Sequence, residues 1–131
     1  MIIGMTAAFP VMTKAATSGT CGANLTWTLD DAGTLTISGT GEMYTSDKPW
    51  SSFRRNVKKV VIENGVTSIG DGAFEGSTSL ASITIPDGVT SIGNYAFYGC
   101  TSLTSITIPG SVISIGDGAF VECTSFENIT I

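Results

Sequence analysis

The side chains that could perform acid–base chemistry in this 131-residue chain are carboxylates and lysines, because the sequence contains no histidine. A general base working near neutral pH would have to be one of these groups with a strongly shifted pKa. Two acidic pairs lie close together in the sequence, Asp30 with Asp31 and Asp71 with Glu75. Asp30, Asp31 and Asp71 occupy positions typical of turns, where aspartate hydrogen-bonds to the backbone. We therefore predict structural turns there, no catalytic residue and no enzyme activity.

Metal and cofactor chemistry is not indicated either. The three cysteines, Cys21, Cys100 and Cys123, form no Cys-x-x-Cys pair, and zinc sites are usually built from such pairs or from histidine. The Gly-Asp-Gly segment at 70–72 is much shorter than a calcium-binding loop. No glycine-rich phosphate-binding motif is present. The sequence predicts no metal and no cofactor.

The charge distribution argues against nucleic-acid binding. The net charge is −5, and all six basic residues precede residue 60. From Val66 onward the charged residues are all acidic, and such a surface repels phosphate groups. The basic cluster within 54–59 is interpreted as a solvated face.

The elements that must position these side chains are set by an internal repeat with a period of 23 residues. Its copies begin at Val66, Val89 and Val112. Apolar residues recur in register in three sets: Ile69, Ile92 and Ile115; Phe74, Phe97 and Phe120; Ile83, Ile106 and Ile129. A fixed period of this length is typical of a solenoid, in which each coil stacks its apolar side chains on those of its neighbours.

Each repeat contains the pattern of a short strand followed by a second extended segment. In the second copy, Ile106 and Ile108 are expected to point inward, and Pro109 ends the strand because it cannot donate to a sheet. The segment Val112–Ile115 is expected to be extended, with its first and last side chains inward. Ala119 and Phe120 are expected in one turn of α- or 3₁₀-helix.

The N-terminal half is predicted to cap the solenoid. Alternating apolar residues at Leu25–Leu29 and Leu35–Ile37, separated by turn residues, indicate a β-hairpin. Thr17–Gly22 is expected to be a loop. The predicted divisions are a leader at 1–17, a hairpin capping region at 18–56 and a solenoid at 57–131. Within the solenoid we expect a degenerate half-repeat at 57–65, repeats at 66–88 and 89–111, and a truncated repeat at 112–131.

The leader, 1–17, is apolar and closes with small residues, which is typical of the end of a secretory signal peptide. We expect a partial export signal and a secreted or cell-surface location. No other segment is long and apolar enough to span a membrane.

Two repeat positions leave alternatives open. Cys100 and Cys123 occupy the same position, which is Ser77 in the first copy. Neighbouring coils lie about 4.8 Å apart, so a disulfide is feasible, and a small inward-facing side chain is the other hypothesis.

The outward positions of the strands form polar columns, interpreted either as a solvated face or as a binding surface. The candidate binding residues are Ser82, Thr84, Ser105, Thr107, Asn128 and Thr130.

The phrase from Ile92 to Pro109, with its Leu-x-x-Ile-x-Ile pattern at 103–108, resembles the BspA-like class of leucine-rich repeats found in bacterial surface proteins. The resemblance covers 57–131, although a proline stands where the usual repeat has asparagine. The region from Cys21 to Trp50 is similar to the cap that often precedes such arrays. The resemblance implies a mainly β, right-handed leucine-rich-repeat solenoid with a sheet on one side, in exported adhesion proteins, and it implies no catalytic residue.

The predicted function is therefore a non-catalytic, secreted or surface-displayed binding or adhesion module. Its partner would be a protein or glycan on a host or neighbouring cell surface, with no nucleic acid and no membrane span. The alternatives are a structural spacer and a glycan-binding accessory domain of a larger secreted protein. Because the sequence stops at Ile131 within a predicted strand, we also expect a longer natural protein or end-to-end association through the uncapped last coil.

Overall fold

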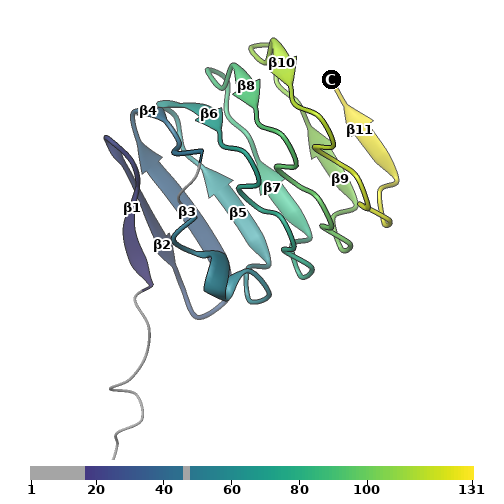
Figure 1. The fold of residues 1–131 in the computed structure, drawn as a ribbon, viewed down its shortest axis with the longest axis horizontal. Helices are drawn as coiled ribbons and strands as arrows, with labels where there is room; N and C mark the ends of the chain where they lie inside the picture. The colour runs from purple at the N-terminus through teal and green to yellow at the C-terminus, as the bar shows by residue number, and fades with distance from the viewer. Residues whose placement is uncertain (1–16, 46–47) are drawn as a thin grey trace, which may run out of the picture.

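The computed structural model describes residues 17–45 and 48–131, which form a mainly β solenoid of stacked coils (Figure 1). The predicted leader therefore lies outside the described residues, apart from Thr17. The strands are β1 (Ser18–Gly22), β2 (Leu25–Leu29), β3 (Thr34–Gly39), β4 (Gly41–Glu42), β5 (Lys59–Ile62), β6 (Val66–Ile69), β7 (Ser82–Thr84), β8 (Ser91–Ile92), β9 (Ser105–Thr107), β10 (Ser114–Ile115) and β11 (Asn128–Thr130). A 3₁₀ helix, η3 (Ser51–Phe53), lies between β4 and β5.

The strands build two walls of the solenoid. The longer wall is a five-stranded sheet in the order β1-β2-β3-β5-β7, and β9 and β11 form the pair beyond it (Figure 1). The second wall has the order β10-β8-β6-β4. Parallel pairing joins β5 to β7, with Lys59 opposite Ser82, and β9 to β11, with Ser105 opposite Asn128. Since the partners are one repeat apart, the predicted 23-residue coil is confirmed.

A column of aromatic rings runs through the core. Phe97 packs between Phe74 and Phe120, with ring centroids 5.6 Å and 5.4 Å away. Trp50 stacks on Phe74 at 5.8 Å and extends the column by one coil. Phe74, Phe97 and Trp50 are buried, which confirms the inward orientation predicted for the recurrent phenylalanine.

Ala119 and Phe120 lie in the expected single turn, which the Val121 N–H closes by donating to the Gly118 carbonyl over 3.1 Å, but this turn does not continue into a helix. The equivalent segments of all three repeats form hydrogen-bonded turns, and the only described helix is η3. Backbone N–H groups of these turns donate to the next coil: Phe74 N–H binds the Ala96 carbonyl and Phe97 N–H binds the Ala119 carbonyl, each over 2.8 Å. Donors used between coils are not available for the bonds along the chain that a helix requires.

The predicted hairpin is confirmed as β2 and β3, with Trp27 opposite Ile37. The loop expected at Thr17–Gly22 is wrong, because β1 pairs antiparallel with β2. The glycines of this segment indicate a loop in the sequence. In the structure Gly19 instead lies close to the Trp27 indole, because a Cβ added to Gly19 would be only 3.1 Å from Nε1. Here glycine permits close packing on an aromatic ring within a strand.

The N-terminal region is continuous with the solenoid. β3 pairs parallel with β5, placing Ile37 opposite Ile62, and β4 pairs parallel with β6. The segments 34–45 and 48–56 therefore follow the path of a coil, and Trp50 takes the place that phenylalanine has in later coils. β1 and β2 extend the longer wall beyond β3, at the N-terminal end of the solenoid.

The last coil differs from the others in burial. Ile115 was expected to point into the core, but it is 44% exposed, whereas the equivalent Ile92 is 2% exposed. Ile131 is 90% exposed, whereas the equivalent Ile108 is 3% exposed. The physical reason is that stacking, rather than the coil itself, removes these side chains from water, and no described coil follows the last one.

Candidate binding surface

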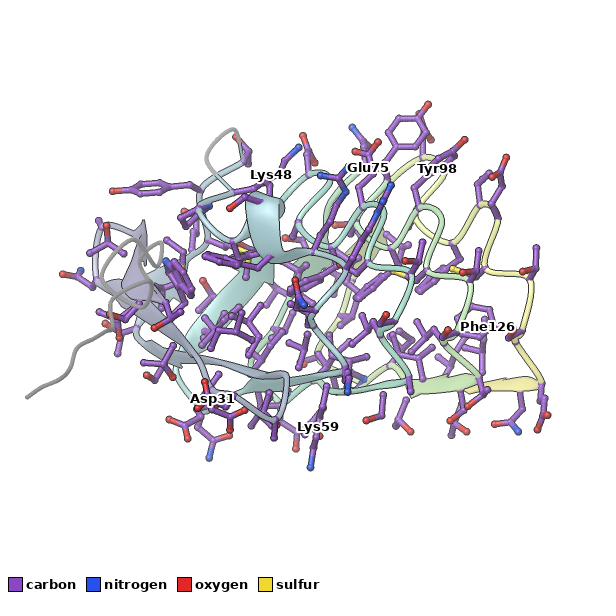
Figure 2. The ribbon with its side chains drawn as sticks, turned by 90° about the horizontal axis from the view of Figure 1, so that it is seen from below. Asp31, Lys48, Lys59, Glu75, Tyr98 and Phe126 are labelled. Carbon is purple, nitrogen blue, oxygen red and sulfur yellow. The ribbon has the colours of Figure 1, made fainter. Side chains whose placement is uncertain are left out.

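The six candidate residues lie on the outward face of the longer wall. Each is exposed, while Ile106 and Ile108 of the same strand region are buried on the inward side. The register of β9 and β11 places Ser105 beside Asn128 and Thr107 beside Thr130. Ser82 and Thr84 stand one repeat earlier, so the two columns are Ser82, Ser105 and Asn128, and Thr84, Thr107 and Thr130. Lys59 continues the first column toward the N-terminus, and Figure 2 shows this face with Lys59 at its edge.

The polar groups on this face are available to a partner. Within the described part of the chain, none of the six side chains makes a hydrogen bond to protein. By contrast, hydroxyls elsewhere on the coils bond to the neighbouring coil: Ser102 Oγ donates to the Thr78 carbonyl and Ser125 Oγ to the Thr101 carbonyl, each over 2.6 Å. The candidate face therefore combines unused donors and acceptors with a backbone held by a sheet.

One carboxylate of each acidic pair, Asp30 and Asp71, caps backbone groups. Asp30 Oδ1 accepts hydrogen bonds from the backbone N–H groups of Ala32 and Thr34, both over 2.9 Å. Asp71 Oδ1 accepts from Asn94 N–H over 2.8 Å, and Asn94 Oδ1 accepts from the backbone N–H of the next coil over the same distance. Such side-chain-to-backbone bonds explain why Asp or Asn recurs at this repeat position.

The cysteines provide no metal site. Cys100 and Cys123 are buried thiols that are not joined to each other. Their Sγ atoms donate to the carbonyls of Phe74 and Phe97 over 3.2 Å and 3.1 Å. Burial raises the pKa of the Cys100 thiol to about 12. In residues 17–45 and 48–131 no cluster of three His, Cys, Asp or Glu side chains could hold a metal ion.

A groove that sequence reasoning missed lies on the turns, opposite the candidate face. It has a volume of about 490 Å³, and its charged and aromatic lining includes Lys48, Arg54, Glu75, Tyr98 and Glu122. Figure 2 shows Lys48, Glu75 and Tyr98 along one edge, with Lys59 on the other side of the coils. One signal could have located the groove: Glu122 stands where the other two copies have glycine.

Stacked coils with this register define a leucine-rich-repeat solenoid protein. The sequence profile of the BspA type leucine rich repeat region matches residues 51–131, which is more than half of the chain. The chain belongs to the BspA-type leucine-rich-repeat family. Among curated proteins none matches the sequence.

Two solved structures illustrate the likeness. A leucine-rich repeat protein from Eubacterium ventriosum is 26% identical with a TM-score of 0.57, over 87% of this chain and 44% of that one. A leucine-rich repeat protein from Bacteroides capillosus is 22% identical, also with a TM-score of 0.57, over 88% of this chain and 98% of that one. The chain thus spans less than half of the Eubacterium protein, and the second likeness concerns the fold alone.

Membrane insertion by a helix finds no support in the described ranges. None of their helices has the length and apolar character needed to cross a bilayer.

Proposed function

We propose that this chain is a non-catalytic binding module, secreted or displayed on a bacterial surface, that attaches to a protein or glycan on another cell. The observation that carries the proposal is the outward sheet face: six exposed polar side chains, regularly spaced and without hydrogen bonds to the protein. Membership of a family of bacterial surface proteins supports the location. Acid–base catalysis is not favoured, because Asp30 and Asp71, one carboxylate of each pair, cap backbone groups.

The face has the properties of a docking surface. Hydroxyl and amide groups repeat along the solenoid at the strand spacing of about 4.8 Å, and both can donate and accept hydrogen bonds. These polar side chains stand on a strand whose inward side chains, Ile106 and Ile108, are buried in the core. The strand is therefore already ordered, and a partner would not have to order it on binding. Lys59 is the one charged side chain in the two columns described here, and we therefore expect binding to depend weakly on ionic strength.

The proposal can be tested with beads coated with the purified chain and applied to cultured epithelial cells. Thr107→Lys and Thr84→Lys place a charged side chain on the proposed face and should reduce attachment at least tenfold, the effect of about 1.4 kcal/mol. Thr124→Lys adds the same charge to an exposed turn outside the face and is the matched control. Protease and glycosidase treatment of the cells separates a protein partner from a glycan. Attachment unaffected by the face variants would overturn the proposed surface.

A structural spacer is the second candidate function, and the exposed location is tested separately. If the chain is only a spacer, parent beads will attach no better than uncoated beads. Surface display predicts that protease added to intact cells of the source bacterium removes the chain. Protection from protease in intact cells, with cleavage after lysis, would contradict display.

End-to-end association is proposed on a separate observation, the apolar side chains that the last coil exposes. These are Ile115, Ile129 and Ile131, whose equivalents in the preceding coil are buried by stacking. Exposed apolar side chains of this kind are stabilised when a second molecule covers them. Sedimentation equilibrium of this 131-residue chain should show a concentration-dependent increase in mass that Ile115→Lys abolishes. A monomer at all concentrations would refute the association.

A further inference from the structure

The groove on the turns has a floor of backbone and walls of charged side chains. Gly76 and Gly99 lie in the lining on successive coils, and a Cβ added to Gly99 would meet only the Gly76 backbone, at 3.9 Å. Arg54 lies over Gly76, since a Cβ there would be 3.0 Å from its Nε. There is therefore open space above Gly99 in the lining of the groove, which Arg54 and Glu122 also border.

The repeat departs from glycine at two neighbouring positions of this surface. Glu122 replaces the glycine of the other copies and has φ 61°, and Tyr95 replaces a glycine with φ 56°. A non-glycine residue in this left-handed region is strained, and such strain persists where it serves a function. Glu122 reaches into the groove, where its Oε2 accepts a hydrogen bond from the Tyr98 hydroxyl over 3.4 Å. The Tyr95 ring lies 5.9 Å from the Tyr98 ring.

The charges of the groove are separated along the solenoid axis. Lys48 and Arg54 lie at the N-terminal end, and Glu122 lies at the opposite end, three coils away. Lys48 Nζ and Glu75 Oε1 both lie near Gly72, where an added Cβ would be 2.8 Å and 3.0 Å from them. Arg54 has no carboxylate partner among the described residues: its guanidinium Nη1 donates to the Ser51 carbonyl over 3.2 Å. The remaining guanidinium donors can bind a carboxylate of a ligand.

The lining indicates the class of ligand. No Ala, Val, Leu, Ile or Met side chain of the described residues lines the groove, so it lacks the apolar pockets that anchor a peptide. It instead offers an aromatic ring, Tyr98, the hydroxyls of Thr78 and Thr101, and carboxylate acceptors. A sugar ring presents apolar C–H groups to an aromatic face and hydroxyls to acceptors at its edges.

We propose that this groove binds an acidic sugar residue, one that carries a carboxylate on a pyranose ring. Arg54 binds the carboxylate, Tyr98 packs against the ring, and Glu122 accepts hydrogen bonds from sugar hydroxyls. The site is independent of the sheet face, which lies on the other side of the coils (Figure 2).

The experiment is an NMR titration of the full chain with methyl glucuronide, following the Gly99 amide and the Tyr98 ring. A ligand of this size is expected to bind with a dissociation constant of about 1 mM. Methyl glucoside, which lacks the carboxylate, should bind at least about tenfold more weakly, because a charge-assisted hydrogen bond is lost. Arg54→Gln should remove this preference.

Glu122→Gly restores the glycine of the repeat and provides the sharpest variant. It relieves the strained φ, so the chain should melt no lower than the parent while methyl glucuronide binding falls about tenfold or more. Glu127→Gln and Thr107→Lys, which change residues outside the groove, should bind like the parent. Absence of shifts at ~10 mM methyl glucuronide, or equal binding of methyl glucoside, would overturn the proposal. Tighter binding of a glutamate-rich peptide would overturn it in favour of an acidic protein segment.

Discussion

Replacing Phe97 with alanine tests whether coil-to-coil packing supplies the stability of the fold. Phe97 is fully buried, and it packs against Phe74 at 5.6 Å and against Phe120 at 5.4 Å, with interplanar angles of 23° and 1°. Alanine removes the ring and leaves a cavity that the flanking coils can close only by leaving their strand register. It therefore destabilises two interfaces at once.

The expected cost can be worked out from these contacts. Phe→Ala in a core costs about 3–5 kcal/mol in total, and the upper part of this range applies where aromatic pairs, worth about 0.5–1.5 kcal/mol each, are lost. Because Phe97 belongs to two such pairs, we expect a loss of about 4–5 kcal/mol in the free energy of unfolding. Phe120 is only partly buried on the last coil, so Phe120→Ala should lower the free energy of unfolding by about 2–3 kcal/mol.

The assay is urea denaturation followed by circular dichroism, with Phe97→Leu as the matched control. Leucine keeps most of the apolar volume and should cost less than about 1.5 kcal/mol. If Phe97→Ala lies within about 1 kcal/mol of the parent, or if Phe120→Ala costs as much, the stacking argument is refuted.

Three further changes probe the polar contacts of the coils. Asn94→Ala should cost about 1 kcal/mol because the Asp117 N–H loses its acceptor, and Asn94→Asp, which keeps the acceptor, should restore most of the stability measured by urea denaturation. Ser77→Ala should leave the melting temperature equal or higher, because the buried Ser77 Oγ has no hydrogen-bond partner among the described residues; a large decrease would contradict this. Burial raises the Cys100 pKa from 9.0 to about 12, so the folded state retains a proton that the unfolded state releases above pH 9.0. The free energy of unfolding should consequently fall as pH rises through this window and stay level below it, and Cys100→Ser should lessen the slope in denaturation series between about pH 8 and about pH 10; an unchanged slope would refute the assignment.

The predictable part of the fold is the part that repeats. Ile69, Ile92 and Phe97 recur at a constant spacing, and identical neighbours give each of them the same buried environment. The exposed Ile115 shows the limit of this reasoning, because its burial depends on a following coil and not on its own repeat. The β1 strand shows another limit: the glycines that indicate a loop are there to let the strand pack closely on Trp27.

Of the two candidate surfaces, one could be predicted from the sequence and the other could not. The sheet-face columns were predictable, since Ser82, Ser105 and Asn128 follow from strand alternation and the period alone. The groove was not, because its residues come from different coils and from positions at which the copies disagree. Only Glu122 left a trace in the sequence, as a departure from glycine.

By itself, the sequence determined the length of the coil, the residues that fill it and the polar character of its outward face. It could do so because stacking couples each coil only to its neighbours, so a local period is sufficient to specify the contacts. Tertiary structure decided that β1 pairs with β2 and that β3 pairs with β5. It also decided which apolar side chains stay exposed, and that Arg54 and Glu122 border one groove. Those outcomes depend on backbone conformation at the turns and on contacts between unlike coils, which no single repeat contains.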